Sequence, residues 1–511
     1  MSNQSENKRI AYNSLFLFAR MFVTLIIGLY TSRVLLSALG VSDYGIYNVV
    51  GSVVIMFSFI NTAMVNSTQR FVTYELGKKD EKKLNRVFST SINIHAIISF
   101  LIIIVSETVG VWYLNNKMVI PADRLVAANW VFQFSLLSSV VGMMNAPFSA
   151  LIVAHEKMSA FAYMSLMDAI LKLLIAYLII ITDGDRLIFY GLFLLIINVL
   201  ERFVYVIYCK KKFTESKYHW CWDKKLYGDM SKFALFNFFG NFSYACYTQG
   251  LNLLLNVFFT PAVNAARGIA VQVQNAICNF SYNIEYAIKP QITITYSQNK
   301  IERMHALISL SARISFYALL IISVPILLET DQILMIWLND VPEYAASFIR
   351  FSILIAWIEA MANPLQTAVQ ATGNIKRYQI IIGFLTFSIL PLSYIALLFI
   401  QAPVVVYVVS LLFEIFIQVI KVVLVGNQIN LAIKNYFVDV FLRTLMVAII
   451  ALVLVYPIYY FLNESLSRII IVTICSCLII CILVFLIGLK KPERAMVNKK
   501  IEVLILKLKN K

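Results

Sequence analysis

The stretch SRVLLSALGVSDYGIYNVVG, residues 32–51, closes one long apolar run and opens the next. This arrangement is typical of the tip of a helical hairpin in a membrane. Gly40 stands where the residue after a helix adopts a left-handed conformation. Ser42 is placed to cap the following helix, with Asp43 against its positive N-terminal dipole. Tyr47 is an amphipathic ring suited to the headgroup level of a bilayer.

The composition is that of an integral membrane protein. Of the 511 residues, 60% are hydrophobic and 14% are charged, whereas soluble chains carry about 25% charged residues. The net charge of +16 invites a nucleic-acid function, but the basic residues lie between apolar runs, so we expect a bilayer and no nucleic acid as the partner. The first apolar run is too long for a signal peptide and lacks a cleavage site, so we expect it to remain as a helix.

A membrane-spanning helix needs about 20 largely apolar residues, and the sequence contains fourteen such segments. The predicted fold class is therefore an all-α polytopic membrane protein. The predicted spans are residues 10–39, 44–69, 88–114, 125–154, 159–182, 187–209, 233–259, 265–290, 305–328, 344–370, 379–400, 404–426, 438–462 and 468–489.

The distribution of basic residues predicts the orientation. If the N terminus is cytoplasmic, the cytoplasmic loops and termini hold 28 of the 43 Lys and Arg residues. The loops on the other side hold four, namely Lys117, Arg124, Arg186 and Arg468. Because cytoplasmic loops carry an excess of Lys and Arg, we expect fourteen helices with both termini in the cytoplasm.

The sequence divides into two halves of six helices. Gly45-Ile46 matches Gly268-Ile269 at an offset of 223 residues, and Thr73-Tyr74 matches Thr295-Tyr296 at 222. The nearly constant offset indicates a diverged duplication with a symmetry axis along the membrane normal and a cavity between the halves. We predict an N-terminal lobe, a basic cytoplasmic linker, a C-terminal lobe, and two further helices with a basic tail, covering residues 1–209, 210–232, 233–426 and 427–511 respectively.

Enzyme signatures are missing from the sequence. No G-x-x-x-x-G-K-[ST] phosphate loop is present, and His155-Glu156 lacks the second histidine of a zinc protease motif, since position 159 is Ser159. We therefore expect neither catalysis nor a cofactor.

Ionisable residues inside the spans are the informative ones. Such a group costs about 2.5–3.5 kcal/mol near a helix centre and usually faces a cavity or a partner. The spans hold fewer acidic than basic residues, which favours an anionic solute. The acidic residues include Glu107, Asp168, Glu201, Glu285, Glu359 and Glu414; the basic ones are Arg20, Arg33, Arg70, Lys172, Arg202, Arg267, Lys289, Arg313, Arg350, Lys421 and Arg443.

Some of these residues have simpler explanations. Asp168–Lys172 and Glu285–Lys289 are i,i+4 pairs that neutralise one another on a helix face. Several others lie near span ends, where a long side chain can reach the headgroups; these are Arg33, Arg70, Arg202, Lys289 and Arg443.

Arg20 and Arg267 are harder to explain in this way. Arg20 lies about eleven residues into the first span, and Arg267 begins a span rich in amides that include Gln274. The preceding span also carries amides, among them Asn241 and Asn252. Amides and hydroxyls suit a sugar, and arginine gives a diphosphate paired, charged hydrogen bonds.

Two local motifs carry a family resemblance. LSALGVSDYGIY (36–47) and NAARGIA (264–270), together with the Asn-Pro sequences of the fourth and tenth spans, resemble the polysaccharide transporters. These are the O-antigen (Wzx-type) lipid-linked oligosaccharide flippases of the MOP (MATE-like) exporter superfamily. The resemblance extends over the fourteen helices and the basic central loop, and it implies a MATE-like arrangement of two pseudo-symmetric six-helix bundles plus two C-terminal helices.

The resemblance also implies a function. Family members move a polyprenyl-diphosphate-linked oligosaccharide to the outer leaflet of the bacterial inner membrane by alternating access, for O-antigen, capsule or another surface glycan. Glycan polymerases and assembly proteins are the implied protein partners, and H⁺ or Na⁺ the implied coupling ion. Arg20 and Arg267 best match the cavity arginines of related flippases, with Arg313 and Arg350 as lesser candidates. Asp168, Glu359 and Glu414 are the candidates for ion coupling.

Three alternatives remain open from the sequence. A cation-coupled multidrug antiporter of the same fold would require an acidic cavity. A lipid II flippase would present a similar cavity. A non-transporting scaffold of a glycan assembly complex would retain its assembly role when cavity residues are replaced.

Overall fold

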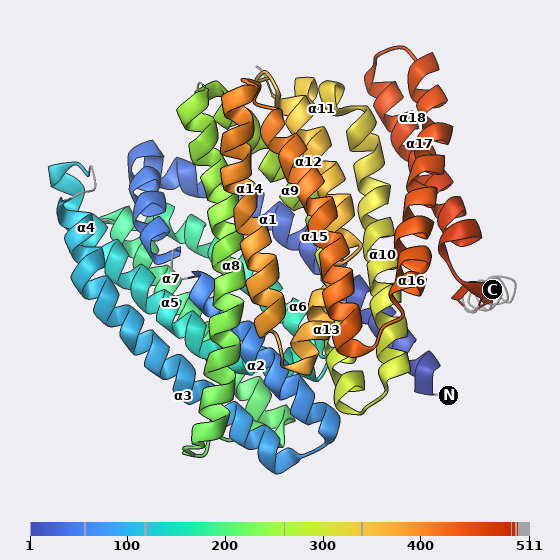
Figure 1. Ribbon diagram of the computed structural model, residues 1–511. Coiled ribbons are helices and arrows are strands. Elements are labelled where there is room, and N and C mark those ends of the chain that lie inside the picture. Colours follow the sequence, from blue (N-terminus) through green and yellow to red (C-terminus); the bar gives the residue numbers. More distant parts are fainter. Residues whose placement is uncertain are drawn as a thin grey trace, which may run out of the picture. The chain divides into compact units, whose positions relative to one another are not determined.

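The computed structural model describes residues 2–55, 58–116, 120–259, 261–338, 341–491, 493–495 and 498. Within these ranges the chain is helical and contains no β-strand (Figure 1). The predicted fold class is therefore confirmed.

The helices of the first half begin with a long, interrupted α1. Their bounds are α1 Ser2–Ile55, α2 Ser58–Lys78, α3 Glu81–Val105, α4 Val111–Asn116, α5 Leu125–Ala154, α6 Met158–Leu178, α7 Arg186–Lys212 and α8 Lys224–Phe258. The remaining helices are α9 Pro261–Ser297, α10 Ile301–Leu328, α11 Thr330–Trp337, α12 Ala345–Ala360, α13 Asn363–Thr372, α14 Lys376–Phe399, α15 Val405–Ile429, α16 Ile433–Tyr436, α17 Arg443–Phe461 and α18 Leu466–Leu483.

Ten helical segments of the described chain are long and apolar enough to cross a membrane. Each coincides with one of the fourteen predicted spans, so the chain is a multi-pass membrane protein. The four predicted spans outside this set lie in α1, α2, α8 and α9. The sequences of α2, α8 and α9 carry many amides and hydroxyls, whereas the first limb of α1 contains an apolar stretch, Leu15–Gly28.

The chain forms two compact units. Unit 1 contains residues 1–242, 289–300 and 370–380, and unit 2 contains residues 243–288, 301–369 and 381–511. The division falls inside α8 and α9, so each of these helices contributes to both units.

The hairpin tip in unit 1 is built around Gly40. This residue has φ +77° and ψ 168° and interrupts α1. The positive φ, which glycine adopts at little cost, confirms the predicted break in the helix. The side chain of Ser42 lies outside the described residues, so the predicted cap is not described. Before the break, Val34 and Ala38 pack in an apolar cluster with Ile175 of α6.

Asp43 does more than face a helix dipole. Both of its carboxylate oxygens accept hydrogen bonds from Arg124, at 2.9 Å from Nε to Oδ1 and by a second, shorter contact from Nη2. Arg124 also donates to Asp185, at 2.7 Å from Nη1 and 3.2 Å from Nη2. Asp185 in turn caps α7 by accepting from the backbone N–H groups of Leu187 and Ile188. One guanidinium thus joins three connections at one end of unit 1, the end that the sequence predicts to lie outside the cell.

In unit 2 the C-terminal hairpin of α17 and α18 is fixed to α10 by two ion pairs. Arg468, at the start of α18, donates to both oxygens of the buried Glu329 at 2.9 Å each. From the middle of α10, the buried Arg313 binds Glu493, which follows α18, through both Nη atoms, at 3.0 and 2.5 Å. The two pairs therefore attach the C-terminal segment to the middle of α10 and to Glu329, directly after the end of that helix.

We predict that Arg124→Gln lowers the thermal stability of the purified protein. The substitution leaves Asp43 and Asp185 facing one another without a cation, and lost hydrogen bonds to charged groups cost roughly 1–3 kcal/mol. The melting temperature in detergent, followed by circular dichroism, should fall by several degrees. Asp123→Asn is the matched control, since the exposed neighbour of Arg124 loses a charge without losing this network; an equal fall in both variants would contradict the role given to Arg124.

Candidate functional site

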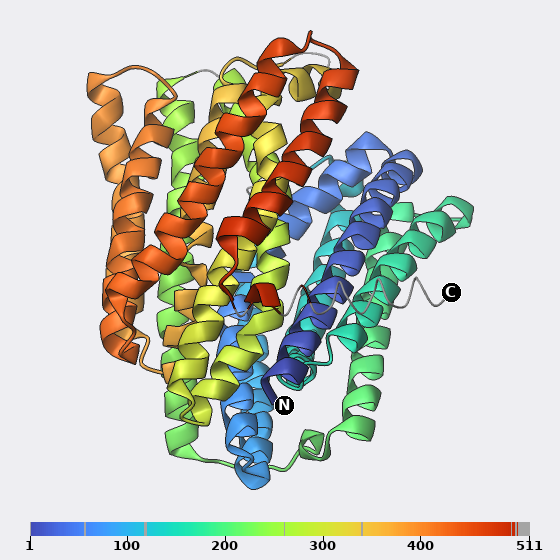
Figure 2. The ribbon, with the colours of Figure 1, turned by 90° about the vertical axis from the view of Figure 1, so that its right-hand side faces the viewer.

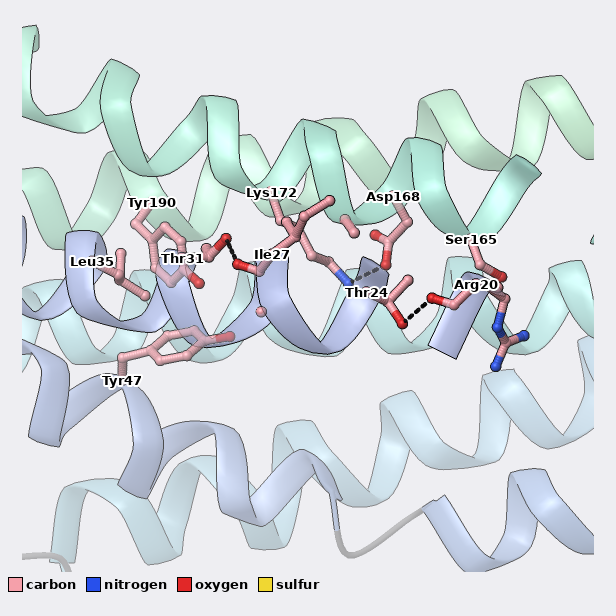
Figure 3. Close-up of a pocket in the computed structure, with 12 residues that line it drawn as sticks. Arg20, Thr24, Ile27, Thr31, Leu35, Tyr47, Ser165, Asp168, Lys172 and Tyr190 are labelled. Atoms are coloured by element: carbon pink, nitrogen blue, oxygen red, sulfur yellow. Dashed lines mark hydrogen bonds and ion pairs between the residues drawn. The ribbon is translucent and has the colours of Figure 1, made fainter. Parts of the chain in front are cut away.

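Unit 1 contains a cavity of about 480 Å³ between α1, α6 and α7. Arg20 lies at one end of it, and the rings of Tyr47 and Tyr190 lie at the other (Figure 3). The size lies within the range of small-molecule sites, about 300–1,000 Å³. The whole set of lining residues is Arg20, Thr24, Ile27, Gly28, Thr31, Leu35, Tyr47, Ser165, Asp168, Ala169, Lys172 and Tyr190.

Two cations and one carboxylate line this cavity. Lys172 Nζ donates to Asp168 Oδ2 at 2.8 Å, which confirms the predicted i,i+4 pair. The guanidinium carbon of Arg20 lies 5.0 Å from the ring centroid of Phe161, a cation–π distance. Lys172 pairs with Asp168, and Arg20 is the second cation among the residues that line the cavity.

The other end of the cavity is aromatic. The rings of Tyr47 and Tyr190 pack edge to face with centroids 4.8 Å apart. Tyr47, which the sequence predicts at headgroup level, also lines the cavity, because the second limb of α1 directs its ring toward Tyr190 of α7. Thr24 and Thr31 use their hydroxyl groups to donate to the carbonyls of Arg20 and Ile27 (Figure 3). This end offers rings and hydroxyls, which are the groups that bind sugars.

Arg267 occupies a second polar position, in unit 2. Its side chain is 5% exposed. Nε donates to Asn252 Oδ1 at 2.5 Å, and Nη2 donates to the carbonyl of Thr248 at 2.8 Å. The guanidinium carbon also lies 5.8 Å from the ring centroid of Tyr407 on α15. Among the described residues these partners are all uncharged, so the positive charge of Arg267 is held in place but not neutralised.

Unit 2 also contains an acidic cluster on α12 and α15. Glu414 is buried, lies 3.8 Å from Lys421 Nζ, and accepts a hydrogen bond from the fully buried Gln418. Glu359 lies close enough to Glu414 and Lys421 to interact with both electrostatically. Two carboxylates therefore share one lysine, an arrangement that can take up a cation or a proton. No cluster of three or more His, Cys, Asp or Glu suited to a metal ion occurs in the described part of the chain.

The two lesser arginine candidates both have carboxylate partners. Arg313 binds Glu493 as described above, and its Nη1 also donates to the carbonyl of Gly488 at 3.0 Å. Arg350 donates from Nη2 to Asp331 Oδ2 at 2.6 Å. These ion pairs explain both side chains as structural contacts.

The amide candidates lie on the helices that carry the arginines or precede them. Asn252 is the hydrogen-bond partner of Arg267, and its Nδ2 donates to Gln249 Oε1 at 3.1 Å. Gln274 lies two turns after Arg267 on α9 and is half-buried. Asn241 belongs to unit 1, whereas Arg267 belongs to unit 2.

Sequence reasoning missed Arg70. It was expected to reach toward headgroups, but its side chain is 9% exposed and points into unit 1. Nε donates to the carbonyl of Gln370 and Nη2 to that of Ala371, both at 3.1 Å. These carbonyls end α13, where the helix dipole is negative. The rings of Phe71 and Tyr74 lie 4.5 and 4.7 Å from the guanidinium carbon.

Further contacts in unit 1 involve the end of α9. Gln291 donates to Glu156, which follows α5. Lys289 Nζ donates to Asn66 Oδ1 of α2 at 3.1 Å. Segments from the second half of the sequence therefore complete the predicted cytoplasmic end of unit 1. The only available sequence signal was the polarity of α2 and α9, which does not identify partners.

No protein-family model matches the chain, and no curated protein matches it. Solved structures do match. A MATE transporter in complex with MaD3S aligns with a TM-score of 0.74 at 13% identity, covering 84% of this chain and 97% of that chain. The chain has the MATE fold. An outward-facing multidrug resistance MATE transporter of the MOP superfamily aligns with a TM-score of 0.73 at 13% identity, with the same coverage.

A third similar structure is described by the polarity of its binding pocket. It is a MOP superfamily transporter from Pyrococcus furiosus whose reversed binding-pocket polarity is said to suggest a different function. It aligns with a TM-score of 0.71 at 13% identity, covering 84% of this chain and 97% of that one. At this level of identity the likeness establishes the MATE fold.

We predict that Gly373→Ala weakens the contact between Arg70 and α13. Gly373 has φ +79°, and a Cβ atom would lie 2.5 Å from Arg70 Nη2. The backbone strain costs about 1 kcal/mol, and displacement of the guanidinium adds to it. The melting temperature should fall in Gly373→Ala and should not fall in Gly142→Ala, because there a Cβ meets nothing within 4 Å and alanine is favoured over glycine inside helix α5. Equal melting temperatures in the two variants would contradict the close packing of Arg70.

Proposed function

We propose that this protein is a flippase that moves polyprenyl-diphosphate-linked oligosaccharides from the cytoplasmic to the outer leaflet of the bacterial inner membrane. The proposal rests on the MATE fold together with Arg267, a buried guanidinium held by uncharged acceptors. Glycan polymerases and assembly proteins would be the partners that receive the product.

The chemistry of Arg267 favours an anionic ligand. A guanidinium has five N–H donors and stays charged at any physiological pH. Asn252 and Thr248 take one donor each from Nε and Nη2, and Tyr407 lies beside the same guanidinium; these partners are uncharged, so the positive charge remains for an anionic ligand. A diphosphate oxygen would pair with that charge in a site of low dielectric, where the interaction is strong.

The cavity of unit 1 supports the sugar part of the proposal. Arg20 supplies positive charge at one end, and Tyr47 and Tyr190 supply rings and hydroxyls at the other. We therefore assign charge recognition to Arg20 and sugar contacts to the aromatic end. This assignment does not require that one ligand reaches both units.

The acidic residues of unit 2 support ion coupling. Glu359 and Glu414 share Lys421, so uptake of H⁺ or Na⁺ would balance the excess negative charge. Asp168 is the weaker candidate, since Lys172 already pairs with it.

A multidrug antiporter is the second candidate function. The same acidic cluster favours it, because a cationic drug would pair with Glu359 and Glu414. Arg20 and Arg267 oppose it, because they would repel such a drug. A lipid II flippase agrees with both observations and differs from the main proposal only in the glycan carried; a scaffold would need none of these charges.

We predict that Arg267→Ala abolishes transport without preventing folding. The leaflet location of the lipid-linked oligosaccharide should be measured in cells that lack the protein and in cells that express each variant. Accumulation on the cytoplasmic side should be relieved by the wild type and not by Arg267→Ala. Arg350→Ala is the matched control, since it removes an arginine of the same unit that already pairs with Asp331, and it should transport normally.

The outcomes separate the candidates. Normal leaflet distribution in the deletion strain, with no second exporter present, would refute the flippase proposal and favour the antiporter. Normal transport by Arg267→Ala would remove this residue from the mechanism.

We predict that Glu359→Gln and Glu414→Gln uncouple transport from the ion gradient. Each substitution keeps the shape of the side chain and removes its charge. The remaining carboxylate is then balanced by Lys421, and the cluster no longer attracts a cation. In reconstituted vesicles, the initial rate of wild-type transport should rise with an imposed H⁺ or Na⁺ gradient. The rate of either variant should not respond; Glu302→Gln, at the exposed start of α10, serves as the control that should respond normally.

A further inference from the structure

The linker between α7 and α8 follows one face of α3. Asn85, Ser89 and Asn93 are spaced four residues apart on α3 and so lie on one side of that helix. Figure 2 shows the linker, between α7 and α8, running in extended form at one end of the bundle. All of these residues belong to unit 1.

Hydrogen bonds fix the linker backbone to this face. Asn85 Nδ2 donates to the carbonyls of Glu215 at 2.9 Å and Lys217 at 2.7 Å. Further along, the backbone N–H of His219 donates to Ser89 Oγ at 3.2 Å, and Asn93 Nδ2 donates to the carbonyl of Cys221 at 3.4 Å. Every second residue from 215 to 221 is therefore bound to α3, and the linker is a defined part of unit 1.

Side-chain contacts strengthen the attachment at its start. His155 Nε2 lies 2.5 Å from Glu215 Oε1, and the His155 ring stacks on Phe213 with centroids 4.2 Å apart. Burial disfavours ionisation of Glu215, but the hydrogen bond and charge of His155, a backbone N–H group and the Thr214 hydroxyl together outweigh it and lower the pKa of Glu215. The carboxylate is thus stabilised in its charged form next to the histidine.

Two tryptophans of the linker face outward. Trp220 is 75% exposed and Trp222 is 64% exposed. Such exposure is unusual for tryptophan outside a binding surface. Lys217, Lys224 and Lys225, each within three residues of one of the two rings in the sequence, are exposed, and so are Lys210, Lys211 and Lys212 at the end of α7.

The position along α3 puts these rings near the membrane surface. The apolar stretch of this span, residues 96–114, is about 28 Å long at 1.5 Å per residue, which matches a hydrocarbon core of about 30 Å. Asn93 lies just beyond the polar end of that stretch, and it binds Cys221, which stands between Trp220 and Trp222. The two rings therefore lie at headgroup depth, where tryptophan is enriched.

We propose that the surface formed by Trp220, Trp222 and the flanking lysines binds the headgroups of anionic phospholipids in the cytoplasmic leaflet. This surface is separate from Arg20 and Arg267 in the sequence, and the proposal holds whichever solute the protein transports.

Charge and depth together favour lipid as the occupant. The lysines attract the negative surface of the cytoplasmic leaflet, each contributing about a fivefold gain in binding. The indole rings add apolar contact at the same level. To bind a soluble protein, the exposed tryptophans would have to lie well outside the headgroup region. Trp220 and Trp222 instead lie next to the end of the apolar stretch of α3.

The test uses the full-length protein in nanodiscs of equal parts phosphatidylcholine and phosphatidylglycerol. Two samples are compared, one with brominated phosphatidylcholine and one with brominated phosphatidylglycerol. The bromine atoms lie near the headgroup end of the acyl chains and quench the fluorescence of nearby indole rings. The signal from the linker is the difference in emission between the wild type and the Trp220→Phe/Trp222→Phe variant. We expect brominated phosphatidylglycerol to quench this signal several-fold more than brominated phosphatidylcholine, and added salt to reduce the preference.

Lysine variants locate the source of the preference. Lys217→Gln/Lys224→Gln/Lys225→Gln should make the two lipids quench equally. Lys300→Gln/Lys376→Gln/Lys434→Gln removes three exposed lysines from other connections predicted to lie on the same side and should keep the preference. Circular dichroism verifies that all variants are folded.

Three results would overturn the proposal. Absence of quenching by either lipid would place the linker away from the membrane and favour a soluble partner. Equal quenching by both lipids in the wild type would remove the selectivity for anionic headgroups. An equal loss in the two lysine triples would assign the preference to overall charge.

Discussion

A buried guanidinium needs partners, because arginine keeps its proton in a protein and an isolated charge is costly away from water. The structure meets this requirement for several arginines, and the kind of partner differs among them. Carboxylates neutralise three of them, whereas backbone carbonyls or amides hold the other two without neutralising them. The neutralised residues are Arg124, Arg313 and Arg468; the residues held by uncharged groups are Arg70 and Arg267.

This difference separates structural arginines from candidate ligand-binding ones. An arginine bound on both Nη atoms by a carboxylate, as Arg313 is by Glu493, gains little from a further anion. Arg267 keeps its full charge in a position that Asn252 and Thr248 define, so an anion that arrives there meets a preorganised donor at no further cost of ordering. Arg70 uses its charge on the end of α13, which explains it without a ligand.

The sequence predicted the fold well because hydrophobic length and charge distribution are local properties. It also predicted Asp168–Lys172, since pairs four residues apart meet on one helix face. It did not predict which arginines are neutralised. Glu493 is 180 residues from Arg313, and Glu329 is 139 residues from Arg468, and no periodicity in a sequence reports such contacts.

The hairpin tip shows the same limit at short range. Gly40 was predicted correctly because the turn itself demands a positive φ. The surroundings of Asp43 and Tyr47 depend on Arg124 and Tyr190, which come from later parts of the chain. Backbone requirements are therefore visible in the sequence, while the partners of a side chain are fixed only once the helices have packed.

Helix α15 connects the two candidate functions of unit 2. Its Tyr407 lies against Arg267, and Glu414, seven residues further along the same helix, belongs to the acidic cluster. Seven residues span about 10 Å of helix, so a rigid-body shift of α15 would move both Tyr407 and Glu414. An ion that changes the charge around Glu414 can therefore alter the environment of Arg267 through one element, provided that α15 has two stable positions. Helix α15 alone could therefore couple ion binding at Glu414 to solute binding at Arg267.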